Sequence, residues 1–353
     1  MMVDPITVGM LGSVCVFVLI FLGMHIAFAM MFVGFVGLAV LSSFEAAMPV
    51  TASTMWEVGS FYPYTVIPLF IIMGSFAGSS GMTRELYSSF EKWTRHVPGG
   101  LAVATIAACG AFAAVSGSSV ATAAAMGTVA LPEMDRFKYD PRLSTGSVAA
   151  GGTLGFLIPP SIGFVVYGML TEQSIGKLLV SGILPGILLT VAYATVVVIW
   201  VKMWPDAAPR NLEPVSWTEK VKALKGVKEP LFIFLFAIGG IYAGLFTPDE
   251  AAAVGATLLL LITFIKRKMT GPALFTAMTE ALRISVMVLM LVAGANVFSY
   301  FMALSTIPMQ AANWVISLQV SPYVVYAMIL FVYLILGCFI DAISMMVLTL
   351  PVV

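Results

Sequence analysis

The sequence predicts an all-α polytopic membrane protein, built as an inverted repeat with two re-entrant helical hairpins and unwound spans. Three observations point to this fold class. Of the 353 residues 60% are apolar and only 10% are charged, and the mean hydropathy is +1.04, whereas soluble proteins carry roughly 25% charged residues. The Lys and Arg residues gather in a few short segments. Clusters of Gly, Ser and Pro interrupt two of the apolar stretches.

Composition also bounds the function. Seventeen basic and 17 acidic residues balance to a net charge of zero, so nothing favours nucleic acid as a partner. Cys15, Cys109 and Cys338 lie in apolar runs without metal-binding spacing and are interpreted as packing residues. With His25 and His96 as its only histidines, and no HExxH, GxSxG or paired intramembrane carboxylates, the chain is not expected to be an enzyme or to hold a resident cofactor.

The first 41 residues are expected to form two membrane helices. They lack the basic region and small-residue cleavage site of a secretory signal. Because about 37 apolar-dominated residues exceed the roughly 20 that one span needs, the segment should turn near Gly23–His25.

The basic residues predict the orientation, because Lys and Arg mark cytoplasmic loops. Fifteen of the 17 lie in four segments, whereas the segments 1–5, 43–64 and 247–250 have none and are interpreted as external. The four basic segments are MTRELYSSFEKWTRH, EMDRFKYDPR, 202–228 and 266–268.

Threading the chain through these loops gives the order of the elements. The first half is expected to contain a span over 6–23, a return span ending near 42, a span over 65–80, an interfacial helix over 81–97, a hairpin over 99–131, and spans over 143–170 and 177–203. A polar connector over 205–228 follows. The second half is expected to contain spans over 229–246 and 249–265, an interfacial segment over 269–282, a span over 283–302, an uncharged flank over 303–322, and a second hairpin from about Tyr323.

The stretch 99–131 is predicted to re-enter the membrane without crossing it. Both of its flanks are basic, so both ends should be cytoplasmic. The 15 residues of the first arm, Leu101 to Val115, span about 22 Å, less than the hydrocarbon core of roughly 30 Å. Its tip is the SGSS sequence, formed by Ser116, Gly117, Ser118 and Ser119.

The second half is expected to repeat the first with opposite orientation. The first repeat covers 1–204, the connector 205–228 and an incomplete second repeat 229–353, in which the second hairpin has its tip at GCFIDAISMM around Asp341 and Ser344. Inverted repeats with broken helices near the midplane are the architecture of many secondary transporters.

The SGSS tip has the chemistry of a cation site. A helix that ends in lipid leaves carbonyls unpaired, here those of Val115 and Ser116, and the Ser118, Ser119 and Thr122 hydroxyls could complete an oxygen cage or cap the second arm. Such oxygens suit an alkali cation, and the positive end of the next helix favours a carboxylate. The alternative is that small residues merely allow close helix packing.

A second break is predicted in GGTLGFLIPPSIGF, residues 151–164. Pro159 and Pro160 remove two backbone donors, which should unwind the span before Ser161 and free the carbonyls from Gly155 to Ile158. The alternative is a simple proline kink.

Three acidic residues in two segments remain as further candidates. Asp341 is the only carboxylate between Ile284 and Val353, and an ionisable residue at such depth indicates a functional site, the alternative being capping of the hairpin tip. Asp249 and Glu250 in TPDE belong either to a site or to an ordinary helix start.

Four stretches together resemble a known family. GAFAAVSGSSVATAAAMGTVALPEM, LGFLIPPSIGFVVYGML, SGILPG and GLFTPDEAAAVGA are similar, in this order, to the large membrane subunit of tripartite ATP-independent periplasmic (TRAP) transporters of the ion transporter superfamily. The resemblance implies an elevator-type, sodium-driven importer of small carboxylates such as C4-dicarboxylates or sialic acids, in the bacterial inner membrane. It further implies a small four-helix membrane subunit and a periplasmic solute-binding protein as partners.

By the same resemblance, the SGSS tip and the IPPS break would form one half-site for sodium and solute, and the hairpin around Asp341 would contribute the other. One departure stands out. Pro159 follows Ser118 by 41 residues, so the matching break of the second half would fall near position 385, beyond Val353. The sequence is therefore expected to be truncated or incomplete. The alternatives are a sodium/carboxylate symporter of the same superfamily that needs no binding protein, a channel, or a membrane enzyme.

Overall fold

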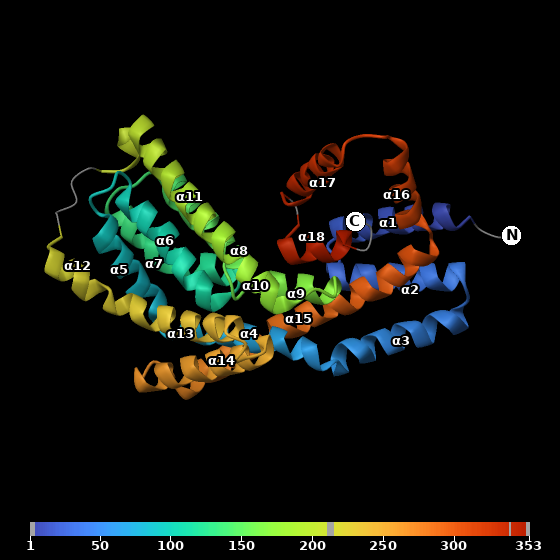
Figure 1. The fold of residues 1–353 in the computed structure, drawn as a ribbon, viewed down its shortest axis with the longest axis horizontal. Helices are drawn as coiled ribbons and strands as arrows, with labels where there is room; N and C mark the ends of the chain where they lie inside the picture. The colour runs from blue at the N-terminus through green and yellow to red at the C-terminus, as the bar shows by residue number, and fades with distance from the viewer. Residues whose placement is uncertain (1–3, 210–214, 339, 351–353) are drawn as a thin grey trace. The chain divides into compact units, whose positions relative to one another are not determined.

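The computed structural model describes residues 4–209, 215–338 and 340–350, and these residues form helices without strands (Figure 1). Four helices are long and apolar enough to cross a membrane, or five if one bent pair counts as a single span. The predicted all-α polytopic class is therefore confirmed for this part of the chain.

The chain divides into two compact units. The terminal unit combines Met1–Tyr64 with Ser285–Val353, and the central unit comprises Thr65–Ile284. This grouping by compactness differs from the sequential repeats 1–204 and 229–353, and the repeat assignment stays a prediction. Residues 210–214 of the predicted connector lie outside the described residues.

The described residues of the central unit form eleven α-helices and the start of a twelfth. They are α4 (Val66–Ser79), α5 (Met82–Thr94), α6 (Gly100–Ser116), α7 (Ser119–Arg136), α8 (Pro141–Leu157), α9 (Ile162–Leu170), α10 (Ile175–Ser181), α11 (Ile183–Met203), α12 (Trp217–Ala223), α13 (Lys225–Tyr242), α14 (Pro248–Ile265) and the first part of α15 (Gly271–Leu304), with a short 3-10 turn η2 (Pro205–Ala207) after α11.

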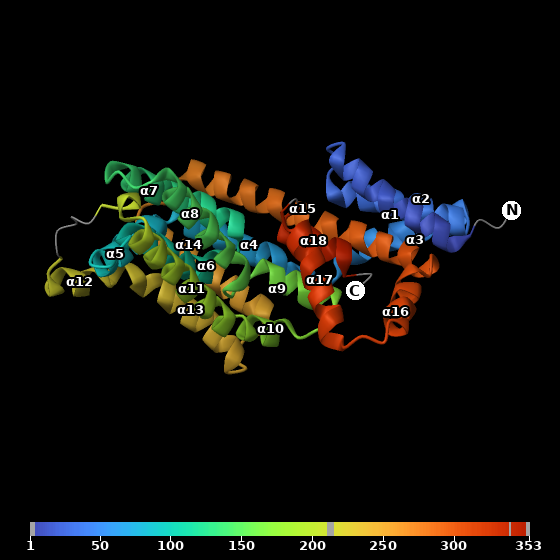
Figure 2. The same cartoon turned by 90° about the horizontal axis from the view of Figure 1, so that it is seen from above.

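Helix α6 forms the core of the central unit. Nearly all of its side chains are buried, and it packs against α4, α5, α7, α8, α11 and α13, among which both Figure 1 and Figure 2 place it. Its residues are mostly Ala and Gly, which allow neighbouring helices to approach closely. The helix is therefore enclosed by protein.

Helices α6 and α7 form the predicted hairpin. An added Cβ on Gly151 of α8 would lie 2.7 Å from Cys109 Sγ of α6, and one on Gly152 would lie 2.6 Å from Ala123 Cβ of α7. Ile158, just after the end of α8, contacts Gly110, which makes α6 parallel to α8. Val148, nearer the start of α8, contacts Gly127, which makes α7 antiparallel to it. The two arms thus run in opposite directions. The second arm extends to Arg136, five residues beyond its predicted end.

The terminal unit is built around the second part of α15. Its elements are α1 (Pro5–Phe21), α2 (Ile26–Leu41), α3 (Phe44–Ser60), most of the 3-10 turn η1 (Tyr62–Thr65), α15 from Ser285, α16 (Ile307–Ser317), α17 (Pro322–Leu336) and α18 (Ala342–Thr349). The turn between α1 and α2 falls at Gly23, with φ +91°, as predicted. The ring of Phe301 on α15 fills a notch left by Gly12 and Gly37.

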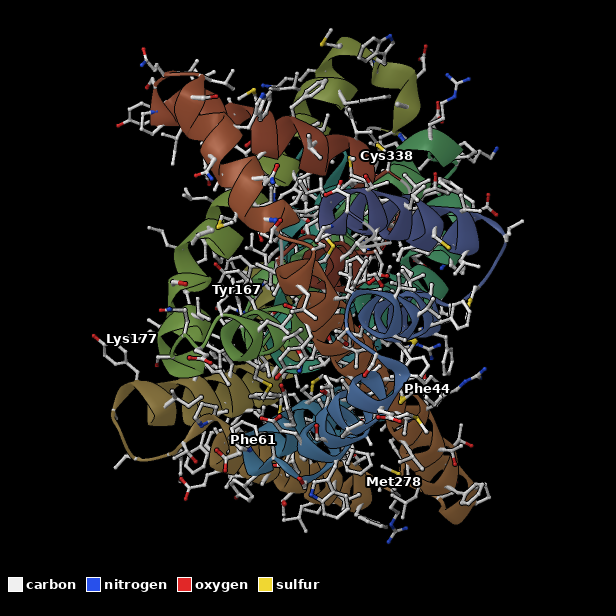
Figure 3. All side chains as sticks on the ribbon, turned by 90° about the vertical axis from the view of Figure 1, so that its right-hand side faces the viewer. Phe44, Phe61, Tyr167, Lys177, Met278 and Cys338 are labelled. Carbon is white, nitrogen blue, oxygen red and sulfur yellow. The ribbon has the colours of Figure 1, made fainter. Side chains whose placement is uncertain are left out.

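One predicted division needs correction, and three other segments contain helices that the sequence did not indicate. The interfacial segment expected over 269–282 and the separate span expected over 283–302 are one continuous helix, α15, from Gly271 to Leu304. The segment 43–64, interpreted only as external, contains α3, whose first residue Phe44 and C-cap residue Phe61 are labelled in Figure 3. The connector 205–228 contains α12 and the start of α13, and the flank 303–322 contains α16.

An ion cluster joins three helices of the central unit. Lys266, which ends α14, lies with its Nζ 2.7 Å from Glu85 Oε2 on α5 and 2.6 Å from Glu229 Oε2 on α13. Burial alone would lower the pKa of Lys266, but the hydrogen bonds and charges of Glu229 and Glu85 outweigh it and raise this pKa. The stabilisation is therefore fully present below the ordinary Lys pKa of 10.5 while the carboxylates are ionised, and it is lost at more alkaline pH.

Replacing Lys266 with Met is expected to lower the free energy of unfolding by about 1–3 kcal/mol, because it leaves two partly buried carboxylates without a cation. Thermal unfolding of the detergent-solubilised protein near neutral pH measures the effect. Lys177→Met is the matched control, since Lys177 on α10 is exposed (Figure 3) and forms no ion pair within the described residues. Equal unfolding temperatures for the two variants would contradict a stabilising role of the cluster.

Candidate functional site

The break between α6 and α7 is two residues long. Helix α6 ends at Ser116 and α7 begins at Ser119, so of the SGSS sequence only Gly117 and Ser118 are non-helical. Gly117 adopts φ +63°, which Gly tolerates without cost. Ser118 is extended, and its hydroxyl accepts a hydrogen bond from the N–H of Ala121 at 3.3 Å. Ser118 is thus the N-cap of α7, one of the two roles predicted for it.

The remaining hydroxyls of this break differ in their partners. Ser116 Oγ and Thr122 Oγ1 lie 2.8 Å apart, with both residues almost fully buried at 1% and 0% exposure. The Ser119 hydroxyl forms no hydrogen bond in the described part of the chain. Since a hydroxyl has two acceptor lone pairs, all three oxygens retain the capacity to bind a cation.

The second predicted break is also present. Helix α8 ends at Leu157, α9 begins at Ile162, and their axes differ by 42° across the Pro-Pro peptide, which is cis. Pro160 cannot donate to the carbonyl of Phe156, and the Ser161 hydroxyl donates to that carbonyl instead. The unwound residues are 158–161, so Gly155, expected within the break, is helical.

The structure brings the two breaks together. The N–H of Ile162 donates to the carbonyl of Gly117 at 3.2 Å. An added Cβ on Gly117 would clash with the carbonyl oxygen of Pro160, and one on Gly155 would clash with that of Ser118. Both glycines are therefore required for the close approach of the two backbones. Gly155 thus has a role in this site although it is helical.

Several carbonyls at this junction are free to bind a ligand. No hydrogen bond within the described residues reaches the carbonyls of Val115, Ser116, Ile158, Pro159 or Pro160. The Ile158 side chain packs against Gly110 and Gly186, so only its backbone is available. Opened backbone is tolerated at membrane depth where protein or an aqueous cavity surrounds it, and the burial of Ser116 and Ser161 meets this condition.

This junction lies in a region that matches a known family. Residues 13–353 match the family described as "Tripartite ATP-independent periplasmic transporter, DctM component". The chain belongs to the DctM family. It is thus a multi-pass membrane protein and a component of a transporter, as the sequence motifs predict.

Relatives of this DctM chain are named as transporter permeases. It is 35% identical to the "C4-dicarboxylate TRAP transporter large permease protein DctM" of Pseudomonas aeruginosa, over 85% of this chain and 70% of that protein. It is 34% identical to the "Isethionate TRAP transporter permease protein DctMQ" of Oleidesulfovibrio alaskensis, over 99% of this chain and 54% of that protein. The "Sialic acid TRAP transporter large permease protein SiaM" of Vibrio cholerae is 28% identical, over 94% of this chain and 77% of that protein.

In the terminal unit of the DctM chain, Asp341 caps a helix. Its carboxylate accepts hydrogen bonds from the N–H groups of Ile343 and Ser344 at 3.1 and 3.2 Å, and it begins α18. The Tyr333 and Thr349 hydroxyls, 2.9 Å apart, connect the two arms on either side of this tip. Capping is therefore confirmed for Asp341, and its participation and that of Ser344 in a binding site stay predictions.

The TPDE segment is a helix start. Thr247 Oγ1 accepts from the N–H of Glu250, and the Glu250 carboxylate accepts from the N–H of Thr247 at 2.8 Å, a capping box that begins α14. The capping box explains the presence of Glu250 at this position without a role in ligand binding.

One residue at the junction of the DctM chain was not predicted from the sequence. Gly74 of α4 faces the first break, because an added Cβ there would lie 2.5 Å from the carbonyl oxygen of Ser116. A glycine inside an apolar helix indicates close backbone approach, and this was the available signal. The sequence did not reveal which backbone approaches it.

Proposed function

We propose that this chain is the large membrane subunit of a sodium-coupled, elevator-type importer of small organic acids. The observation that carries the proposal is the junction of the two helix breaks, where the N–H of Ile162 bonds the carbonyl of Gly117. Broken helices that meet in this way hold the substrate and the coupling ion in many secondary transporters.

The oxygens of the junction suit a sodium ion. Carbonyls of Val115, Ser116, Pro159 and Pro160, with the hydroxyls of Ser116, Ser119 and Thr122, are neutral hard ligands within two adjoining segments. The ends of α6 and α8 add the partial negative charge of their carbonyls. The partial negative charges of these neutral oxygens suffice to bind a monovalent cation.

A carboxylate would bind at the N-terminal ends of the helices that follow the two breaks. Helices α7 and α9 both begin at the junction, at Ser119 and Ile162, and helix N-termini favour anions. The names of the relatives refer to C4-dicarboxylate, isethionate and sialic acid, which are all organic acids. We therefore assign the solute to this class.

The proposed setting is the bacterial inner membrane. There the chain would pair with a small four-helix membrane subunit and receive its solute from a periplasmic binding protein, in keeping with the tripartite, periplasmic description of the family. The hairpin α6–α7 would re-enter the membrane and move with its bound ion and solute.

The test uses proteoliposomes that contain the complete assembly, loaded binding protein and a labelled dicarboxylate or sialic acid. Uptake is expected to require an inward sodium gradient, to stop when potassium replaces sodium, and to stop without the binding protein. Equal uptake in potassium would contradict sodium coupling. Sodium-dependent uptake of free solute without the binding protein would favour the two-component symporter instead, and ion current without a solute gradient would favour a channel.

A further inference from the structure

A hollow of about 330 Å³ lies at the start of α5 in the central unit, away from the helix junction. We call it the α5 hollow. Its lining includes Gly81 just before α5, Thr83 and Arg84 of α5, Thr128 of α7 and Lys268 from the turn after α14. Segments distant in sequence therefore form one concave surface.

The charges at the α5 hollow favour an anion. Arg84 and Lys268 are exposed and form no ion pair within the described residues. The hollow contains one carboxylate, that of Glu85, which lies 2.7 Å from Lys266 Nζ. With Glu85 engaged, two unpaired cations remain.

The N-terminus of α5 adds backbone donors. This 13-residue helix begins after Gly81, which has φ +78° and no side chain to cap it. The N–H of Met82 is taken by Ser80 Oγ at 3.1 Å, whereas no acceptor within the described residues binds the N–H groups of Thr83 and Arg84. Free N–H groups and the helix dipole together make a binding site for an anion.

A buried hydroxyl gives an independent indication of a ligand. Thr83 lines the hollow, is only 5% exposed, and its hydroxyl has no hydrogen-bond partner in the part of the chain that the structure describes. Buried polar atoms are rarely left unpaired in native proteins. The surrounding protein covers this hydroxyl, so a turn of the Thr83 side chain toward the hollow would let an acceptor oxygen bound there supply the missing partner.

The position of Lys268 is fixed by backbone structure. Helix α14 ends in a Schellman motif, in which Arg267 adopts φ +54°, the N–H of Arg267 bonds the carbonyl of Phe264, and the N–H of Lys268 bonds that of Thr263 at 3.0 Å. Its side chain passes over Gly81, with Cε 3.8 Å from the position of an added Cβ. The ammonium group is thus held on the side of the α5 N-terminus.

We propose that the α5 hollow binds a phosphate group. A guanidinium, an ammonium, two backbone N–H groups and a hydroxyl provide more donors than a single carboxylate can use, and they match the several oxygens of a phosphate. The phosphate is that of an anionic phospholipid headgroup or of free inorganic phosphate. Its site lies on the basic, amphipathic helix that the sequence predicts at the cytoplasmic membrane surface.

The experiment titrates the detergent-purified full chain with inorganic phosphate and, separately, with short-chain phosphatidylglycerol, and follows binding by calorimetry. Saturable binding of either ligand is expected, and the ligand that binds identifies the source. Arg84→Gln and Lys268→Gln should each weaken it about tenfold or more, since each removes a charge-assisted contact. Thr83→Val, which keeps the shape of the side chain, should weaken it by a smaller factor.

Lys177→Gln, the same change at an exposed Lys without an ion pair on α10, is the matched control and should leave the affinity unchanged. Thermal unfolding of each variant identifies any that fails to fold. Lys268→Gln is the variant most expected to fold, because Lys268 lies outside a helix. The proposal is overturned if neither ligand binds saturably, or if folded Lys268→Gln binds as tightly as the control.

Discussion

Replacement of Gly117 with Ala is expected to lower the free energy of unfolding by about 2–5 kcal/mol and to abolish solute uptake. Two costs add at this position. A residue with a Cβ at φ +63° costs roughly 1–2 kcal/mol, and the added Cβ clashes with the backbone carbonyl of Pro160, an overpacking of about 1–3 kcal/mol. Backbone cannot rotate away as a side chain can, so the two breaks must separate.

The consequence for transport follows from the same geometry. Separation of the breaks removes the hydrogen bond from Ile162 to the Gly117 carbonyl and displaces the oxygens that we assign to the ion. Unfolding in detergent and uptake by the complete assembly measure the two effects. Gly146→Ala on α8 is the control, because nothing lies within 4 Å of an added Cβ there and Ala favours a helix. If the Gly117 variant is as stable and active as the Gly146 variant, the junction is not a required close contact.

Local features of the sequence sufficed to predict both breaks. Pro159 and Pro160 remove donors wherever they lie in a helix, and Gly117 and Ser118 offer a left-handed residue followed by an N-cap. The contact between the breaks could not be predicted in this way. Gly117 and Ile162 are 45 residues apart, and their approach depends on how α8 packs between α6, α7 and α11.

The division of α15 was predicted wrongly for a physical reason. Glu280 and Arg283 interrupt the apolar pattern, and such charges indicate a boundary between membrane and cytoplasm. They do not indicate a boundary of the helix, because Glu and Arg are good helix formers. The continuous helix of 34 residues is about 50 Å long, more than a span requires.

Ser119→Ala is expected to raise the sodium concentration for half-maximal uptake roughly 5–30-fold, the equivalent of about 1–2 kcal/mol for one lost oxygen ligand. The structure singles out this residue within SGSS. The Ser118 hydroxyl caps α7, so Ser118→Ala would also destabilise the helix by about 1 kcal/mol, whereas the Ser119 hydroxyl has no hydrogen bond in the described residues. An Ala at position 119 removes the hydroxyl that we propose as a sodium ligand and keeps the packing.

Thermodynamic linkage between ion binding and solute binding explains why an uptake assay detects a loss of sodium affinity. If both bind at the same pair of breaks, weaker sodium binding must appear as a higher sodium requirement for the solute. Ser181→Ala is the matched control, since the exposed Ser181 hydroxyl bonds only a carbonyl of its own helix. The unfolding temperature should be the same in both variants. Wild-type sodium dependence of Ser119→Ala would leave SGSS with its capping and packing roles alone, and the coupling ion would then have to bind elsewhere.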